Sequence, residues 1–460
     1  MTSSMWIFPM SLSATRRWPD RWYAAPMLAL LAVSVASCGV IGGNDKPKTT
    51  PTLGNRMPVL SRIESGAKVD PSLATVAVVL PTAETNPDWG QPGGNAGKSY
   101  GNLALAASPT KAWTASIAGS KPSERLAAAP VIGGGMLFAF DTAGEVHAFD
   151  ATTGAAKWSV KLRMEENNSS LFGGGVSFAD GRVYVTTGLG EVAALDATNG
   201  TQIWRVKPAG PLRGSPTIAF DAIYVMTQDN QIVALNAADG KALWNESGSQ
   251  ATAGVFGVAA PAAGQGTVIA GYSSGELTAY RYENGRQLWT DALARTSIAT
   301  SVATLTDIDA DPIIDRGRVY ALGQGGRMAA YELVTGQRIW ELNLAGISTP
   351  AIAGEWIFVL TDDSRLLCLA RTTGKVRWIA QLQQFKNDEK KKGEYFWTGP
   401  VLAGDRLWVA NMRGEVVAIA AADGAMTPFT KLGDPVSLAP VVANNTLYIL
   451  DDSGKITAFR

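Results

Sequence analysis

The sequence is poor in the side chains that most often perform catalysis or bind metals. Its 460 residues include two cysteines and one histidine. A single histidine excludes the histidine pairs of catalytic and zinc sites, and two distant cysteines exclude a haem-attachment motif. His147 stands in an alternating apolar segment, so it is predicted to be a structural residue of a strand.

Charge is also scarce and balanced. Charged residues make up 17% of the chain, and the formal net charge is zero. A protein that binds nucleic acid through phosphate contacts needs a clear excess of lysine and arginine. No nucleic-acid partner is therefore expected.

The apolar stretch near the N-terminus, residues 24–35, is shorter than the ~20 residues that a membrane-spanning helix needs. Basic residues precede it, so residues 1–37 are predicted to be an export signal. The end of this stretch, Val35-Ala36-Ser37-Cys38, resembles the bacterial lipobox, which implies cleavage before Cys38 and its acylation. Gly39 rather than Asp follows, which in lipoproteins implies the outer membrane. An ordinary signal peptide with a chance cysteine is the alternative.

Residues 38–88 are rich in proline, threonine, glycine and asparagine and show little periodicity. This composition predicts a flexible tether. A short apolar stretch, Val76–Leu80, is a candidate strand without an indicated partner. Cys368, the second cysteine, lies in an apolar segment and is predicted to be a buried, unreactive thiol.

One eleven-residue pattern dominates the rest of the chain. Ala148–Trp158 (AFDATTGAAKW) is an apolar run, a polar turn with glycine four residues before tryptophan, and a second apolar run, which predicts strand, turn and strand. Copies at intervals of about 40 to 50 residues indicate a repeat architecture. The other copies are Ala194–Trp204, Ala234–Trp244, Ala279–Trp289, Ala330–Trp340 and Cys368–Trp378.

Two further strands precede each copy, so each repeat predicts a four-stranded antiparallel blade of a β-propeller. A seventh repeat, Thr398–Gly424, has Pro428 in place of tryptophan, and an eighth, Leu438–Arg460, ends before its fourth strand. Lys111–Ile117 contains Trp113 and lacks preceding strands, so it is predicted to complete the eighth blade. The predicted fold is all-β, an eight-bladed propeller over residues 89–460 that leaves no open sheet edge. The tryptophans are predicted to pack between blades.

Ligand-binding motifs of known type are absent. The aspartates of Asp307-x-Asp309-x-Asp311 suggest a calcium loop, but Pro312 and Arg318 stand where an EF-hand needs glycine and glutamate. The glycine runs border strands instead of helix starts, which excludes a phosphate loop. Neither a metal nor a cofactor is expected.

Two segments depart from the repeat, Pro211–Gly214 and Leu305–Asp309. Each lies between an outermost strand and the next innermost strand, so both should reach the same face of the ring. An exposed leucine beside Arg213, with separated aspartates, favours a protein-binding site. The alternative is that Leu212 packs under the rim and the aspartates bond turn amides. Residues 163–172 and 383–396 lie on the same side; the latter is predicted to be a solvated loop or a secondary contact.

The repeats resemble those of pyrroloquinoline-quinone (PQQ) dehydrogenases over residues 89–460. Those enzymes have adjacent cysteines and a calcium site, which this chain lacks. Lipobox, tether and eight compact blades are instead similar to the BamB family. That resemblance implies that Leu212, Arg213, Asp307 and Asp309 bind BamA through its POTRA domains. Gly210 replaces a leucine that family members can have, which implies a smaller apolar contact.

The resemblance thus implies a non-enzymatic lipoprotein scaffold, anchored to the periplasmic face of the outer membrane, that binds a BamA-like protein and assists folding of outer-membrane β-barrels. A PQQ-dependent dehydrogenase and a generic periplasmic protein-binding propeller are the alternatives. Binding of unfolded client strands is left open, and the closed ring argues against it except at blade rims.

Overall fold

The computed structural model describes residues 67–162, 173–249, 259–293 and 306–460. These residues form 34 strands and no helix, and 32 of the strands belong to eight four-stranded sheets. No helix of the described residues has the length and apolarity needed to cross a membrane. The prediction of an all-β, eight-bladed propeller is confirmed.

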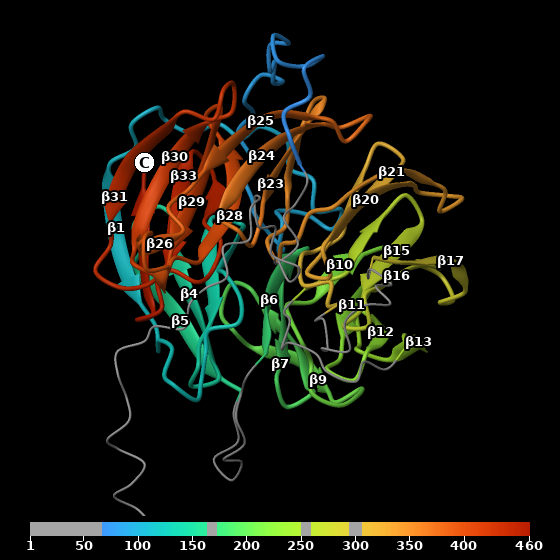
Figure 1. The fold of residues 1–460 in the computed structure, drawn as a ribbon. Coiled ribbons are helices and arrows are strands. Elements are labelled where there is room, and N and C mark those ends of the chain that lie inside the picture. The colour runs from blue at the N-terminus through green and yellow to red at the C-terminus, as the bar shows by residue number, and fades with distance from the viewer. Residues whose placement is uncertain (1–66, 163–172, 250–258, 294–305) are drawn as a thin grey trace, which may run out of the picture. The chain divides into compact units, whose positions relative to one another are not determined.

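Seven blades are built from four consecutive strands, A to D, each antiparallel to the one before it, and they follow one another around the ring (Figure 1). Strand A is fully or mostly buried in every blade, while strand D alternates between buried and exposed residues, so A is innermost and D outermost. The seven blades are as follows: blade 1, β2 (Val131–Gly133), β3 (Met136–Phe140), β4 (Glu145–Asp150) and β5 (Ala156–Lys161); blade 2, β6 (Gly174–Ala179), β7 (Arg182–Thr187), β8 (Val192–Asp196) and β9 (Gln202–Val206); blade 3, β10 (Thr217–Ala219), β11 (Ala222–Met226), β12 (Gln231–Asn236) and β13 (Ala242–Ser247); blade 4, β14 (Ala262–Gly264), β15 (Thr267–Gly271), β16 (Glu276–Arg281) and β17 (Gln287–Ala292); blade 5, β18 (Ile313–Asp315), β19 (Arg318–Gly323), β20 (Arg327–Glu332) and β21 (Arg338–Leu342); blade 6, β22 (Ala351–Ala353), β23 (Trp356–Leu360), β24 (Arg365–Ala370) and β25 (Val376–Gln381); and blade 7, β28 (Trp397–Ala403), β29 (Arg406–Asn411), β30 (Glu415–Ala420) and β31 (Met426–Lys431). A short hairpin, β26 (Phe385–Asn387) and β27 (Lys392–Glu394), lies between blades 6 and 7.

The eighth blade joins the two ends of the ring. It contains β32 (Val441–Ala443), β33 (Thr446–Leu450), β34 (Lys455–Phe459) and, as its outermost strand, β1 (Lys111–Ser116). Figure 1 shows β1, drawn in cyan, beside the red C-terminal strands. The backbones of Thr110 and Arg460 exchange two hydrogen bonds of 2.7 Å. The predicted closure by an N-terminal strand is confirmed.

The blade topology gives the ring two different faces. The D-to-A and B-to-C connections lie on one face, which we call the loop face, and the A-to-B and C-to-D turns lie on the other, the turn face. Among the described residues, a long connection such as 382–396 makes the loop face irregular, whereas the A-to-B turns of the turn face are short in every blade. Insertions in repeat proteins commonly gather on the binding face.

The N-terminal segment covers the turn face. Trp89 exchanges two backbone hydrogen bonds with Ile132 of blade 1, and Gly97 accepts one from Ile314 of blade 5. Earlier in the segment, Val69 forms a parallel bridge with Val376 at the outer edge of blade 6. The prediction of a flexible tether is therefore wrong for residues 67–88, because they bond to the ring. Residues 38–66 lie outside the described residues.

Candidate functional site

The segment Pro211–Gly214 runs along the loop face toward the ring axis. Leu212 pairs with Thr227 in an isolated antiparallel bridge, and the Arg213 N–H donates to the Met226 carbonyl at 2.9 Å. These bonds extend the sheet of blade 3 past the end of β11. They hold the Arg213 backbone rigidly, so its side chain has a defined position at the inner rim.

The second segment is anchored by its neighbours in the same way. The Ile308 N–H donates to the Tyr272 carbonyl of blade 4 at 3.2 Å, and the Asp307 carbonyl accepts from the Gln324 N–H of blade 5 at 2.9 Å. Ile308 is fully buried and packs against blades 4 and 5. Asp309, one residue further, therefore points to the inner rim from a fixed backbone.

The two segments meet there. Arg213 Nη2 donates to Asp309 Oδ1 at 3.2 Å, and the two side chains are 1% and 8% exposed. Blades 3 and 5 are thus linked by an ion pair, which we call the rim pair. The structure brings three of the four predicted site residues into one electrostatic cluster, because Asp307 also interacts with Arg213.

Burial sets the protonation of this cluster. It raises the pKa of Asp309 to about 6; the Arg213 guanidinium opposes the rise, and the carboxylates of Asp307 and Asp362 add to it. Burial also lowers the pKa of Arg213, against the effect of the two aspartates. A guanidinium stays charged even so, because its ordinary pKa lies far above neutral pH. The rim pair is therefore ionic near neutral pH and becomes a cation beside a neutral acid as Asp309 is protonated.

Leu212 is not exposed, which corrects that part of the sequence-based prediction. It is fully buried and packs between blades 2 and 3, against residues such as Val192 and Val225. Arg213 and Asp307 are buried as well, so Asp309 is the one predicted site residue with some exposure. The alternative given by the sequence, in which Leu212 packs beneath the rim, is the position that the structure shows. Because they are buried, Leu212 and Asp307 can affect a contact surface only by supporting the residues that lie above them at the inner rim.

A cavity of about 390 Å³ occupies the ring axis, and sequence reasoning missed it. The N-terminal segment forms its floor with residues that include Trp89 and Tyr100. The wall consists of residues that precede or begin strand A in blades 1, 3, 5, 6, 7 and 8, among them Asp309 and Asp311. A repeated signal in the sequence could have located this wall: proline stands at or near the start of strand A in every blade except the second.

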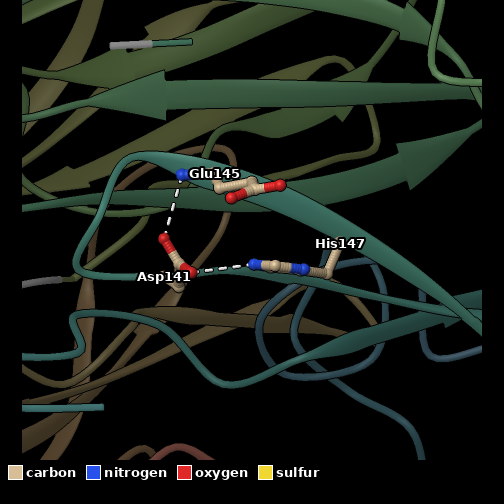
Figure 2. Close-up of side chains that lie close together, drawn as sticks. All are labelled: Asp141, Glu145 and His147. Carbon is tan, nitrogen blue, oxygen red and sulfur yellow. Dashed lines mark hydrogen bonds and ion pairs between the residues drawn. The ribbon is translucent and has the colours of Figure 1, made fainter. Parts of the chain in front are cut away.

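His147 belongs to a small polar cluster on blade 1 (Figure 2). Among the described residues, Asp141, Glu145 and His147 are the one group of three side chains near enough to surround an ion. Asp141 Oδ2 lies 2.8 Å from His147 Nε2, and its Oδ1 accepts from the N–H groups of Ala143 and Glu145. Burial opposes its ionisation, but the bonds from His147 and the Glu145 N–H prevail, so the pKa of Asp141 is lowered.

The same turn recurs without histidine, which shows that Asp141 has a structural role. In blade 7 the amide oxygen of Asn411 accepts from the backbone N–H groups of Arg413 and Glu415. In blade 8 Asp451 accepts from Ser453 and Lys455 in the same way. An amide that replaces the carboxylate in this arrangement argues for turn capping and against ion binding.

The sequence also pointed to two cysteines, an aspartate motif and two loops. Cys38 and residues 163–172 lie outside the described residues. Cys368 is buried in β24, and burial raises the pKa of its thiol. Asp309 turns to Arg213, whereas Asp311 accepts from the Ala260 N–H at 2.7 Å, so these carboxylates do not converge as calcium ligands would. Residues 383–396 include the exposed hairpin β26–β27.

Comparison with known proteins identifies relatives of the whole ring. A family model described as "Outer membrane protein assembly factor BamB" matches residues 103–173, 142–380 and 383–460. The BamB of Salmonella typhimurium is 30% identical over 355 residues, which is 76% of this chain and 88% of the relative. The BamB of Escherichia coli is 29% identical over 353 residues, with the same coverage.

Solved structures agree on the fold. The crystal structure of BamB from Moraxella catarrhalis has a TM-score of 0.62 at 20% identity and covers 77% of this chain and 98% of that one. A quinohemoprotein alcohol dehydrogenase from Comamonas testosteroni has a TM-score of 0.66 at 14% identity, with coverage of 85% and 82%. At these identities the likeness concerns the propeller alone.

Proposed function

Because the chain belongs to the BamB family of outer membrane protein assembly factors, we propose that it is a non-enzymatic scaffold for outer-membrane protein assembly. In this proposal the scaffold is anchored to the periplasmic side of the outer membrane through a lipid on Cys38. It binds the periplasmic domains of a BamA-like protein through the loop face. Its task is to hold that partner in position while β-barrel proteins fold.

The rim pair is the observation that supports this placement best. The turn face is covered by the chain's own N-terminal segment, whereas the loop face has irregular connections and the inner rim. Asp309 reaches the surface of that rim, and Arg213 holds it there. We therefore assign direct contact with the partner to Asp309 and a positioning role to Arg213, with Leu212 and Asp307 supporting both from beneath.

The quinone-enzyme alternative does not fit the cavity. The charged side chains among its described lining residues are Asp309 and Asp311, both carboxylates. PQQ is itself a tricarboxylate, and burying like charges together is strongly unfavourable. The structural neighbours that are dehydrogenases share the ring and show nothing further about this chain.

Affinity measurement with the purified periplasmic domains of a BamA-like protein tests the proposal. Arg213→Met should weaken binding by about 2 kcal/mol, roughly thirty-fold in Kd, because it releases a central anchor. Asp309→Asn, which keeps an acceptor for Arg213, should weaken binding without losing the fold. Circular dichroism checks that each variant is folded.

Arg371→Met is the matched control. Arg371 is also buried, 4% exposed, and pairs with Asp315, but it lies by the turns of the turn face. Its loss should lower stability as much as the loss of Arg213 and leave binding unchanged. Equal effects of the two arginines on Kd would reject the rim as the docking site.

A further inference from the structure

The axial cavity is closed at its far end by the chain itself. Gln91 Nε2 donates to the Ile218 carbonyl and its Oε1 accepts from the Ile218 N–H, both at 3.0 Å. With the Trp89 and Gly97 bonds to blades 1 and 5, these contacts fix the floor across the ring. Among the described residues this segment closes the turn-face end of the cavity, so an occupant would enter and leave by the loop face.

The cavity wall is chemically suited to an apolar occupant. Pro130, Pro350, Pro400 and Pro440 line it, and proline has no N–H to offer to an added strand. Its two carboxylates already have partners: Asp309 bonds Arg213, and Asp311 accepts from Ala260 and interacts with the buried Lys98. An occupant is therefore recognised by shape and apolar contact rather than by strand addition or by charge.

Apolar side chains stand exposed at the mouth. Ile347, Phe396 and Met412 line the cavity and are 51%, 58% and 40% exposed. They come from three different connections on blades 6 and 7, and the Met412 N–H donates to the Phe396 carbonyl at 3.2 Å. We call these three residues the apolar lip. Water-exposed apolar side chains gathered at the edge of a pocket are typical of binding sites.

The volume limits what can enter. The cavity, at about 390 Å³, lies at the lower end of the roughly 300–1,000 Å³ range of small-molecule pockets. It therefore suits a bulky side chain at the tip of a loop. A helix or strand continuing past the tip would not fit, because the floor stops it.

We propose that the axial cavity binds a bulky apolar side chain, aromatic or leucine-like, on a loop of the same protein that docks at the rim pair. This rests on the proposed function, and continuity of the two surfaces supports it. Asp309 belongs both to the rim pair and to the cavity wall. A partner that touches Asp309 therefore lies over the mouth, and filling the cavity would bury the apolar lip.

The test is the affinity of the full mature chain for the purified periplasmic domains of a BamA-like protein. Phe396→Asp should weaken binding at least ten-fold, because a charged side chain would have to be buried with the lip. Val334→Asp is the control, since Val334 is 74% exposed and follows strand C of blade 5 on the turn face. It should change Kd less than two-fold, and neither variant should shift the thermal unfolding midpoint.

A photo-crosslinking residue in place of Ile347 gives a second readout. It should react with the partner, and peptide mapping should place the adduct on a loop with a large apolar residue. If wild-type chain binds and Arg213→Met weakens binding while Phe396→Asp does not, the cavity site is overturned and the proposed function stands. No binding by wild-type chain overturns both.

Two further outcomes also contradict the cavity site. A concentration-dependent dimer of the wild-type chain that Phe396→Asp dissociates would show that a second copy covers the lip. An Ile347 crosslink to co-purified lipid, with none to the partner, would assign the cavity to an acyl chain.

Discussion

Each outer-strand tryptophan fastens its blade to the next one. The ring packs on the glycine of the next blade's C-to-D turn, and the indole N–H donates to a carbonyl in that turn. This explains why tryptophan and glycine recur together: they meet between blades, each tryptophan touching the glycine of the following repeat. The pairs of donor and acceptor, at 2.8–3.2 Å, are Trp113–Ala151, Trp158–Ala197, Trp204–Ala237, Trp244–Tyr282, Trp289–Leu333, Trp340–Arg371 and Trp378–Ala421.

Substitutions at two glycines of blade 5 can distinguish the loss of this packing from the cost of a left-handed backbone. Gly336 and Gly317 have φ values of 71° and 72°, but a Cβ at Gly336 would lie 2.4 Å from Trp289 Cγ, while one at Gly317 meets nothing within 4 Å. Gly317→Ala should cost the ~1 kcal/mol of a left-handed alanine. Gly336→Ala should cost about 1–3 kcal/mol more, because Trp289 must move. Urea unfolding measures both; equal losses would contradict the tryptophan–glycine contact.

Asp309 predicts a pH dependence of stability. Its folded pKa of about 6 exceeds the ~3.9 of an unfolded aspartate, so the folded protein binds more protons between these values. The stabilisation from Asp309 is full below pH ~4 and is lost as the pH rises through 6. Relative to Asp309→Asn, wild-type protein should lose up to roughly 3 kcal/mol of unfolding free energy across this window.

Unfolding midpoints at pH 4, 5, 6 and 7 measure this difference between the two proteins. Asp229→Asn, which removes an exposed carboxylate from the same face, is the control for the loss of one negative charge. A difference that is constant with pH would mean that Asp309 is not the titrating group.

At the scale of elements, blade 7 shows why one tryptophan is missing. Blade 8 has no C-to-D turn, because its strand D is β1, which precedes all the other strands of the ring in the chain. A tryptophan in blade 7 would have no glycine to meet. Phe429 instead packs edge-on against Trp408 and Phe459, with centroids 5.0 and 5.1 Å apart.

Sequence spacing misplaces one residue of this blade. Spacing from Gly424 puts Pro428 at the tryptophan position, whereas the pairing places Thr427 opposite Ala418. The reason is a shifted bulge: it lies between Val416 and Val417 in blade 7, rather than beside the strand D tryptophan as in blades 1 to 6. Counting residues cannot detect a bulge that has moved.

Removal of residues 455–460 tests the closure. This deletion removes all of β34, which pairs with both β33 and β1, so two sheet edges become open. We expect loss of cooperative unfolding and aggregation of the purified protein. Replacing residues 387–392 of the exposed hairpin by two glycines is the control and should leave the unfolding midpoint unchanged. A monomeric deletion variant of normal stability would contradict a ring held together by blade 8.

At the scale of the whole molecule, the fold was predictable because the signal is repeated. Six repeats contain the same turn followed by the same tryptophan, so an ambiguous copy can be interpreted from the others. The site was only partly predictable. The topology put Arg213 and Asp309 on one face, but burial of Leu212 depends on its neighbours in blade 2, and the cavity floor depends on a segment without periodicity.

The segment predicted to be a flexible tether, residues 38–88, was also beyond what the sequence could predict. Its composition is that of a flexible linker, yet Asn102 Nδ2 donates to the Pro81 carbonyl and to Asp405, and Asn86 Nδ2 donates to the Val442 carbonyl. Such bonds fix a chain through single contacts to distant blades. The local sequence pattern does not indicate these bonds, because their partners lie far away in the chain.

The proposed lipid anchor on Cys38 has a direct test. Cys38→Ser should move the mature protein from the membrane fraction to the soluble periplasmic fraction, because acyl chains supply ~0.8 kcal/mol per buried CH₂. Cys368→Ser is the control, since that thiol is buried in β24, and it should remain in the membrane fraction. Fractionation with mass spectrometry of the N-terminus measures both; retention of Cys38→Ser would contradict lipid anchoring.

The pairing of β1 with β34, in which Lys111 lies opposite Phe459, also determines when the ring can close during synthesis. During synthesis β1 emerges before the other strands of the ring, and its partner β34 emerges after them. Seven blades are each built from consecutive strands and can form in order, but the eighth blade, and with it the ring, is completed only when β34 is available to pair with β1. A nascent chain that has not yet reached Phe459 therefore lacks the strand that completes the eighth blade, and its ring stays open.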